Sequence, residues 1–198
     1  MQVKRMKIRI LASILIVMAM LLSACGQKEI KDKRDWPIKD DFSYTDQDGN
    51  PFGLQDLKGK VWVADFIFTT CIDVCLPMTS NMAKLQQMVK DENIKNIEFV
   101  SFSVDPEVDK PEKLKEFGES FSVNFKNWHF LTGYSQESIE KFAMENFKAM
   151  VKKPENEDQV IHGTDFYLVD QNGTIVKYYT GLNKIPFKII LNDIEALQ

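Results

Sequence analysis

An apolar run at residues 61–68, VWVADFIF, is the sequence feature that most constrains the fold. It is rich in β-branched and aromatic residues and does not alternate with polar ones, which is typical of a strand buried on both faces. A helical pattern follows at Pro77 to Lys90, where Met78, Met82 and Leu85 share one face. A sheet built around such a strand needs other elements over both faces, so the run predicts an α/β domain.

Strand and helix patterns alternate along the rest of the chain. Two short apolar pieces, residues 42–45 and 51–54, flank Asp48-Gly49, which predicts an antiparallel hairpin before the central strand. The other expected strands are Asn96–Val104, Trp128–Leu131, Thr164–Val169 and Thr174–Tyr179, and the other expected helices are Lys110–Phe121, Ser135–Met150 and Pro186–Leu197. A turn at residues 170–173 joins the last two strands, so we expect a mixed sheet with a parallel core and an antiparallel part.

The helix expected at residues 135–150 has the clearest amphipathic pattern. Ser135 is a good N-cap for it. Its expected apolar face consists of Ile139, Phe142, Ala143, Phe147 and Met150. We therefore expect these five side chains to lie in the core.

The N-terminus has the pattern of a secretory signal. Four basic residues and no acid precede an apolar run of 13 residues, Ile10–Leu22, which is short for a bilayer span of roughly 20. The run ends in Leu22-Ser23-Ala24-Cys25-Gly26, which resembles a bacterial lipobox. We interpret residues 1–24 as a lipoprotein signal peptide, 25–37 as a tether lipid-anchored at Cys25, and 38–198 as the folded domain. An uncleaved anchor helix is the alternative, and both place the domain outside the cytoplasmic membrane.

The net charge of the chain argues against nucleic acid as a partner. Residues 1–24 hold four of the 25 Lys and Arg and none of the 29 Asp and Glu, so removing them changes the net charge from −4 to −8. An acidic domain without a basic stripe is not expected to bind nucleic acid. Attachment to the membrane is instead expected through the lipid on Cys25.

Two cysteines remain for chemistry, in Cys71-Ile72-Asp73-Val74-Cys75. They follow the central strand and precede a helix, at the sheet edge where α/β proteins bind ligands. A helix N-terminus favours thiolate, and i, i+4 spacing on a helix would put both sulfurs on one face, close enough for a disulfide or a shared metal ion. Two buried structural cysteines, or a static disulfide, are the alternative.

The chain has two histidines. His129 lies in the short apolar strand at residues 128–131 and is expected to pack there. His162 lies in a loop before a late strand, at a place that faces the cysteine pair in a thioredoxin-like layout. Two thiolates and an imidazole suit copper or zinc rather than Mg²⁺ or Ca²⁺. From spacing alone, His162 is equally a ligand or an ordinary polar residue.

Together these motifs resemble the Sco/SenC family. The resemblance extends from about Trp36 to the C-terminus and rests on the hairpin, FIFTTC, the C-x₃-C pair, SVDPE, WHFLTG, and His162 before FYLVD. It implies a thioredoxin-like fold, a central mixed sheet flanked by helices with an added N-terminal β-hairpin. It also implies membrane tethering and a role in forming the dinuclear CuA centre of cytochrome c oxidase subunit II. The implied ligands of copper, as Cu(I) or Cu(II), are Cys71, Cys75 and His162.

The chain departs from the family pattern at two prolines. The family often reads Cys-Pro-Asp-x-Cys-Pro, and here Ile72 and Leu76 occupy the proline positions while Asp73 is kept. Both sulfurs and their spacing remain, so we expect metal binding to persist. Asp73 either tunes the thiols or meets a partner, or is a solvated turn residue.

Three further features near the site have two interpretations each. Met78 is a soft potential ligand, but its helical spacing with Met82 favours a core position. Asp105 either ends a strand or flanks the site. The polar loop Lys152–Asp158 is either simply solvated or moves to carry His162 onto the metal.

Two functions use the same residues. A membrane-tethered copper-binding assembly factor needs Cys71, Cys75 and His162, and oxidation of the pair would release the metal. A thiol–disulfide oxidoreductase, which keeps the CuA cysteines reduced, would attack through Cys71 and resolve through Cys75. A thiol peroxidase is disfavoured because no arginine follows Arg34. We expect a monomeric copper protein on the outer face of the bacterial cell membrane, with subunit II as its partner.

Overall fold

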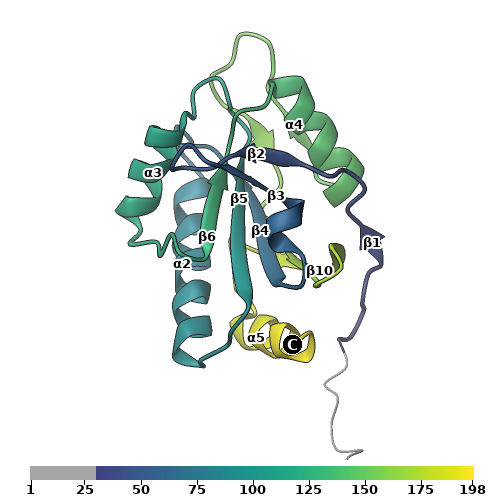
Figure 1. The fold of residues 1–198 in the computed structure, drawn as a ribbon. Coiled ribbons are helices and arrows are strands. Elements are labelled where there is room, and N and C mark those ends of the chain that lie inside the picture. The colour runs from purple at the N-terminus through teal and green to yellow at the C-terminus, as the bar shows by residue number, and fades with distance from the viewer. Residues whose placement is uncertain (1–29) are drawn as a thin grey trace, which may run out of the picture.

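A computed structural model of the chain describes residues 30–198 (Figure 1). The proposed signal peptide, the lipobox and Cys25 lie outside these residues. The strands are β1 Trp36–Pro37, β2 Ser43–Thr45, β3 Pro51–Gly53, β4 Val61–Ile67, β5 Ile97–Ser103, β6 Trp128–Leu131, β7 Val151–Lys152, β8 Ile161–His162, β9 Asp165–Val169 and β10 Thr174–Thr180. The helices are η1 Leu54–Leu57, α2 Cys75–Asp91, α3 Pro111–Ser120, α4 Gln136–Phe142, η2 Ala143–Phe147 and α5 Phe187–Ala196.

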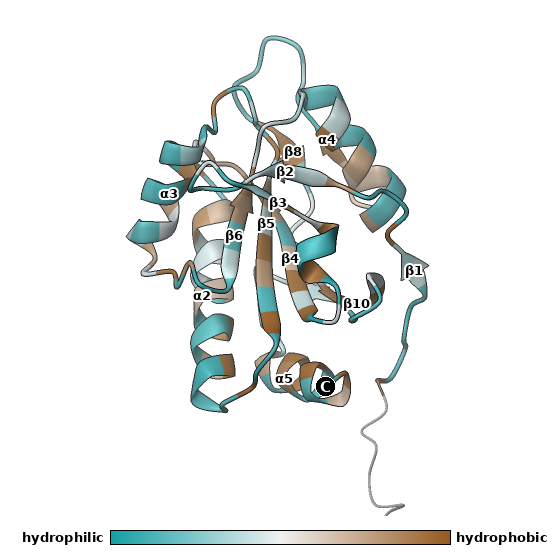
Figure 2. Ribbon diagram, viewed as in Figure 1, coloured by the Kyte–Doolittle hydropathy of each residue, from teal (hydrophilic) through white to brown (hydrophobic). Residues whose placement is uncertain are grey.

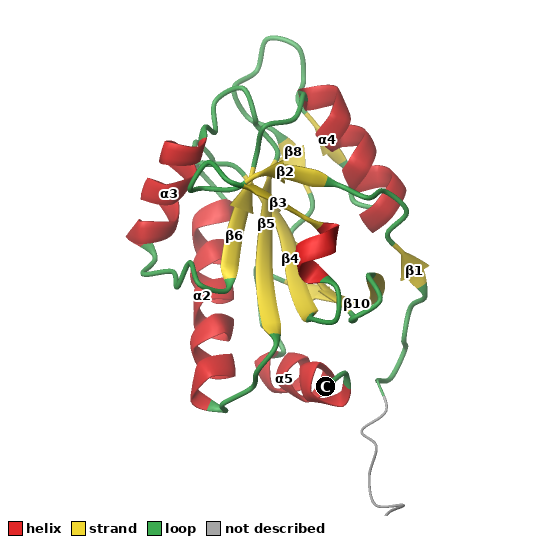
Figure 3. Ribbon diagram, viewed as in Figure 1, coloured by secondary structure: helices red, strands yellow, loops and turns green. Residues whose placement is uncertain are grey.

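A six-stranded mixed sheet organises the domain (Figure 3). Its order is β1-β10-β9-β4-β5-β6, in which β4, β5 and β6 are parallel and the other neighbouring pairs are antiparallel. The hairpin of β2 and β3 is present as a separate two-stranded sheet. The predicted fold class, a mixed sheet flanked by helices with an added hairpin, is therefore confirmed.

Every residue of β4 and β5 is buried, including the polar Asp65 and Glu98, and Figure 2 shows hydrophobic segments along both strands. On one face, Phe66 and Phe102 stack at 5.5 Å and meet Phe147 of η2. On the other face, Phe130 of β6 meets Phe117 of α3. Aromatic packing on both faces supplies much of the hydrophobic stabilisation of the sheet.

The predicted helix at residues 135–150 is wrong in its second half. Ser135 caps it as expected, accepting a hydrogen bond from the Ser138 N–H at 3.1 Å. The α-helix ends at Phe142, and a π turn follows in which Asn146 is buried and accepts from the Lys39 N–H at 2.8 Å. This turn changes the phase of the apolar face, so Met150 is 61% exposed rather than in the core.

The domain also includes part of the predicted tether. Trp36 and Pro37 form β1 on the edge of the sheet, and the Arg34 N–H donates to the Val176 carbonyl at 2.7 Å. Ile30 is buried. Within the stretch that composition assigned to the tether, Ile30 is therefore buried and Arg34, Trp36 and Pro37 pair with β10, whereas residues 31–35 are exposed. Within residues 30–198, no helix combines the length and the apolar character needed to cross a membrane.

Candidate metal centre

The cysteine pair lies at the end of the sheet where the parallel strands finish. β4 leads into a turn at residues 68–74, and α2 then begins at Cys75. Pro77 occupies the first turn of α2, where its missing N–H costs nothing. Cys75 is the first residue of α2 and Cys71 belongs to the turn before it, so the i, i+4 spacing of a helix does not set the distance between the two sulfurs. This turn still brings the two sulfurs together.

A buried carboxylate fixes the start of that turn. Asp109 accepts hydrogen bonds from the Thr69 N–H and hydroxyl, the latter at 2.5 Å, and from the Ser103 hydroxyl at 2.6 Å. Asp109 thereby joins the C-terminal ends of β4 and β5. Burial raises the pKa of the Asp109 carboxyl, and the hydrogen bonds oppose this shift. Sequence reasoning did not identify Asp109, since its partners lie 6 and 40 residues away.

The two thiols are free, and their surroundings shift their pKa values in opposite directions. Cys71 accepts a hydrogen bond from the Cys75 N–H at the start of α2, at 3.3 Å. A hydrogen bond from the Cys75 thiol, with others from the backbone N–H groups of Asp73 and Cys75, lowers the pKa of Cys71 to about 3. The same thiol–thiol hydrogen bond and burial raise the pKa of Cys75. The pair therefore holds one proton, on Cys75, and Cys71 is the thiolate.

His162 reaches the thiols from a two-stranded ribbon of β7 and β8. Its Nε2 lies 3.3 Å from Cys75 Sγ, and its Nδ1 lies 2.8 Å from the Gly163 carbonyl oxygen. A carbonyl only accepts, so Nδ1 carries the proton, and Nε2 of the neutral ring offers its lone pair toward the sulfur. The Phe68 ring packs edge-on against the imidazole at 5.7 Å. His162 thus contacts the site without any movement of the loop.

The ligand atoms of Cys71, Cys75 and His162 all lie within 4.8 Å of one another. Both cysteines are buried, with 7% and 0% of their surface exposed, and His162 is partly exposed. Two sulfurs and one imidazole nitrogen form a soft donor set that fits copper and excludes hard cations. Of the alternatives left open by the sequence, a static disulfide does not agree with these free thiols.

For Met78, His129 and Asp73, the structure supports the simpler interpretation, in which none of them is a ligand. Met78 is fully buried in the core. His129 stacks on Phe52 at 3.8 Å and lies 3.4 Å from Glu98, away from the cysteines. Asp73 is exposed. None of these three contributes to the group of ligand atoms.

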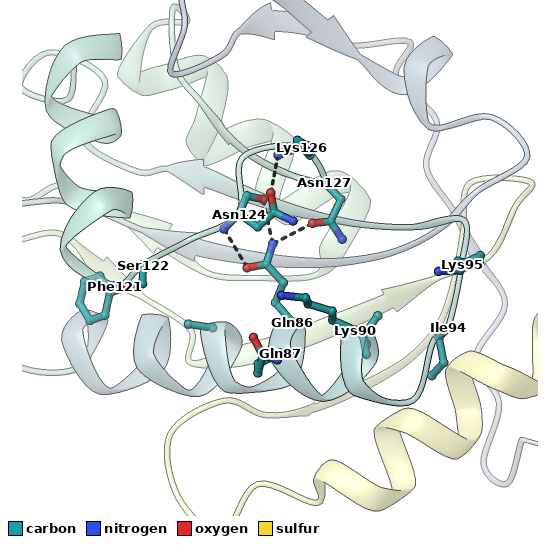
Figure 4. Close-up of a pocket in the computed structure, with 12 residues that line it drawn as sticks. Gln86, Gln87, Lys90, Ile94, Lys95, Phe121, Ser122, Asn124, Lys126 and Asn127 are labelled. Atoms are coloured by element: carbon teal, nitrogen blue, oxygen red, sulfur yellow. Dashed lines mark hydrogen bonds between the residues drawn. The ribbon is translucent and has the colours of Figure 1, made fainter.

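A cavity of about 510 Å³ lies elsewhere, beside the C-terminal half of α2 (Figure 4). Its floor includes Gln86, whose Nε2 donates to the Asn124 carbonyl and to Asn127 Oδ1, both at 2.9 Å. Its lining has no thiol, imidazole or carboxylate group. The cavity therefore does not compete with the cysteine pair as a metal centre.

An ion pair anchors the ribbon that carries His162. Lys153, next to β7, donates to Asp105 Oδ1 at 2.7 Å, and its N–H donates to Glu140 at 3.0 Å. The Asp105 side chain is 2% exposed. This contact spans 48 residues of sequence and gives Asp105 a role that the sequence left undecided. Asp105 is a positioning residue here, since it acts on His162 through the ribbon.

Replacing Lys153 with methionine is expected to destabilise the protein by about 1–3 kcal/mol, because a buried carboxylate loses its partner. Copper affinity should fall as well, since the ribbon holds His162. Urea unfolding and copper competition measure the two effects. Lys152→Met is the matched control, because its ion pair with Glu140 is 63% exposed on the lysine side and is worth about 0–1 kcal/mol. Equal effects of the two substitutions would contradict the anchoring role.

Comparison with known proteins identifies relatives across nearly the whole described chain. A sequence model of the SCO1/SenC family matches residues 31–197. The crystal structure of a SCO1/SenC family lipoprotein from Bacillus anthracis is 54% identical, with a TM-score of 0.82, covering 85% of this chain and 99% of that one.

Two other solved structures share the fold. BsSco, a member of the Sco family of cytochrome c oxidase assembly proteins with an identified disulfide switch, is 49% identical, with a TM-score of 0.79 over 86% of this chain and 98% of that one. ScoI from Bradyrhizobium japonicum, with copper bound, is 27% identical, with a TM-score of 0.66 over 81% and 99%. By its sequence match and its fold, the chain belongs to the SCO1/SenC family.

Proposed function

We propose that this protein binds copper through Cys71, Cys75 and His162 and supports formation of the CuA centre of cytochrome c oxidase subunit II. The observation that carries the proposal is the convergence of two buried sulfurs and one imidazole nitrogen within 4.8 Å. A homologue of the same fold has been solved with copper bound, and another belongs to a family of oxidase assembly proteins.

The residues of the site prepare it for a soft cation. Cys71 is already a thiolate, and the Gly163 carbonyl holds the His162 ring with Nε2 toward the sulfurs. Copper would be held by these three groups as a cargo ion that later passes to its target. Cys75 must lose its proton to become a thiolate ligand, so binding is expected to release a proton.

We further propose that the protein acts outside the cytoplasmic membrane, anchored there by a lipid on Cys25, and that it is a monomer. The lipobox-like end of the apolar N-terminal run supports the lipid anchor, as does the B. anthracis relative described as a lipoprotein. The partner in this proposal is subunit II of the oxidase.

A thiol–disulfide oxidoreductase that keeps the CuA cysteines reduced is the second candidate. The low pKa of the Cys71 thiol favours it, because a thiolate is the attacking species and Cys75 lies close enough to resolve a mixed disulfide. His162 separates the two functions. Copper binding requires its nitrogen, and thiol exchange does not.

Copper titration of the reduced protein tests the proposal. We expect one copper ion per chain, with a thiolate-to-Cu(II) charge-transfer band in the absorption spectrum. In His162→Ala we expect an affinity loss of about 10²-fold, on the order of one ligand's share of a metal-binding free energy, together with a weaker band. Binding that is absent, or indifferent to this substitution, would favour the reductase.

A further inference from the structure

Three exposed apolar side chains adjoin the ligand residues of the metal centre. Ile72 is 83% exposed, Leu76 48% and Ile161 55%, and each is the chain neighbour of a cysteine or histidine in the site. We name these three residues the apolar rim. The other large exposed apolar residues of the described chain are Met144, Met150, Tyr178 and Ile189. Exposure of this kind, gathered around a site, is typical of an interaction surface.

Neighbouring residues of the β7–β8 ribbon place the ligand His162 and the rim residue Ile161 on opposite faces. In the antiparallel pair of β7 and β8, Val151 lies opposite His162 and Lys152 lies opposite Ile161. Side chains alternate along a strand, so His162 and the buried Val151 face inward while Ile161 faces outward. Met150, just before β7, is also exposed and continues the outward face. Ile161 therefore points away from the core, and Ile72 and Leu76 are exposed as well.

Acidic side chains lie beside the apolar rim. Asp73 lies between the two cysteines, and Glu155, Glu157 and Asp158 lie in the loop between β7 and β8. That loop packs near the site, since Gln159 donates to the Thr70 carbonyl at 3.2 Å. Within residues 30–198, no ion pair involves any of these four acids, whereas the nearby Lys153 is paired with Asp105. The surface beside the site thus has uncompensated negative charge.

The site lies at the end of the sheet away from the start of the described chain. In Figure 1 the first described residues lie toward the lower end of the view, as α5 does, whereas α2 begins toward the upper end. Figure 3 places β8 at that upper end as well. An acidic surface at this end would be repelled by anionic lipid, so the geometry favours a protein partner over the membrane surface.

We infer that the apolar rim is the docking surface for a partner protein that presents an apolar patch with a basic fringe around its own thiol ligands. This inference rests on the proposed function. The sulfurs are buried, so a partner's ligands can reach the copper only from the side that the rim surrounds. An apolar contact would exclude water during transfer, and the charges would steer the two proteins together.

The experiment uses the copper-loaded full chain in detergent and the apo CuA domain of subunit II as the probe. Ile72→Ser and Ile161→Ser are each expected to weaken binding of the probe by about tenfold, as for an apolar contact near the centre of an interface. Ile189→Ser on α5 is the matched control, with a similar exposure of 50%, and should bind like the unsubstituted protein. The Glu155→Lys/Glu157→Lys variant should slow association and weaken its salt dependence, whereas Glu92→Lys, at the far end of α2, should not.

Copper affinity distinguishes a failure of the docking inference from a failure of the proposed function. It should be unchanged in every rim variant, and a loss there would overturn the docking role. Rim variants that bind the probe like the unsubstituted protein would overturn this inference and leave the proposed function standing. Substitutions that instead abolish self-association, or pelleting with phosphatidylglycerol vesicles, would assign the rim to a second copy or to lipid. No probe binding by the unsubstituted protein would overturn both proposals.

Discussion

Replacing Cys75 with serine is expected to lower the affinity for copper by about 10²- to 10³-fold. Structural zinc sites with four ligands have apparent binding free energies of about 10–16 kcal/mol, so by analogy one ligand is worth about 2.5–4 kcal/mol. The serine hydroxyl is a hard donor that stays protonated, and position 75 is fully buried, so water does not take the place of the sulfur. Competition with a copper chelator of known affinity measures the change.

Met78→Leu provides the control for that loss. Met78 is a second buried sulfur, three residues along the same helix, and leucine preserves its volume at a cost below about 1.5 kcal/mol in stability. Copper affinity should stay the same in this variant. If the two substitutions weakened copper equally, the thioether would be a ligand and the assignment of the site would be wrong. Retention of tight copper by Cys75→Ser would exclude Cys75 as a ligand.

The sheet and helices could be predicted where the sequence pattern is local. β4 and β5 are rich in β-branched and aromatic residues, and α2, α3 and α5 begin and end within two residues of their predicted limits. The end of the helix after Ser135 could not be predicted in this way. It depends on Asn146 reaching the backbone of Lys39, which is 107 residues away.

Short strands are the second kind of element that could not be predicted from the sequence. β1, β7 and β8 each have two residues, too few to show any period. Each of them forms because it pairs with another strand: β1 pairs with β10, which is distant in sequence, and β7 pairs with β8. This matters for the site, because β8 carries His162. Spacing alone could nominate the histidine, but its contact with Cys75 depends on the ribbon and on the ion pair of Lys153 with Asp105.

Alkylation of Cys71 by iodoacetamide is expected to proceed at a nearly constant rate between pH 5 and pH 8. With its pKa lowered to about 3, Cys71 is fully thiolate across this range. An ordinary thiol, with a pKa of about 8.5, would react about tenfold faster for each unit of pH. The low pKa also reduces intrinsic nucleophilicity, so the distinctive result is the flat profile and not the absolute rate. Tandem mass spectrometry of the modified peptide separates Cys71 from Cys75.

Cys75→Ala tests the cause of the low pKa. The thiol of Cys75 donates the hydrogen bond that contributes most to the thiolate at Cys71, and alanine removes that donor. The pKa of Cys71 should therefore rise, and below the new value its alkylation rate should increase about tenfold per pH unit. The urea-unfolded protein, in which both thiols are ordinary, provides the fully pH-dependent reference. A native profile as steep as that reference, or modification of Cys75 before Cys71, would show that the shared proton does not lie on Cys75.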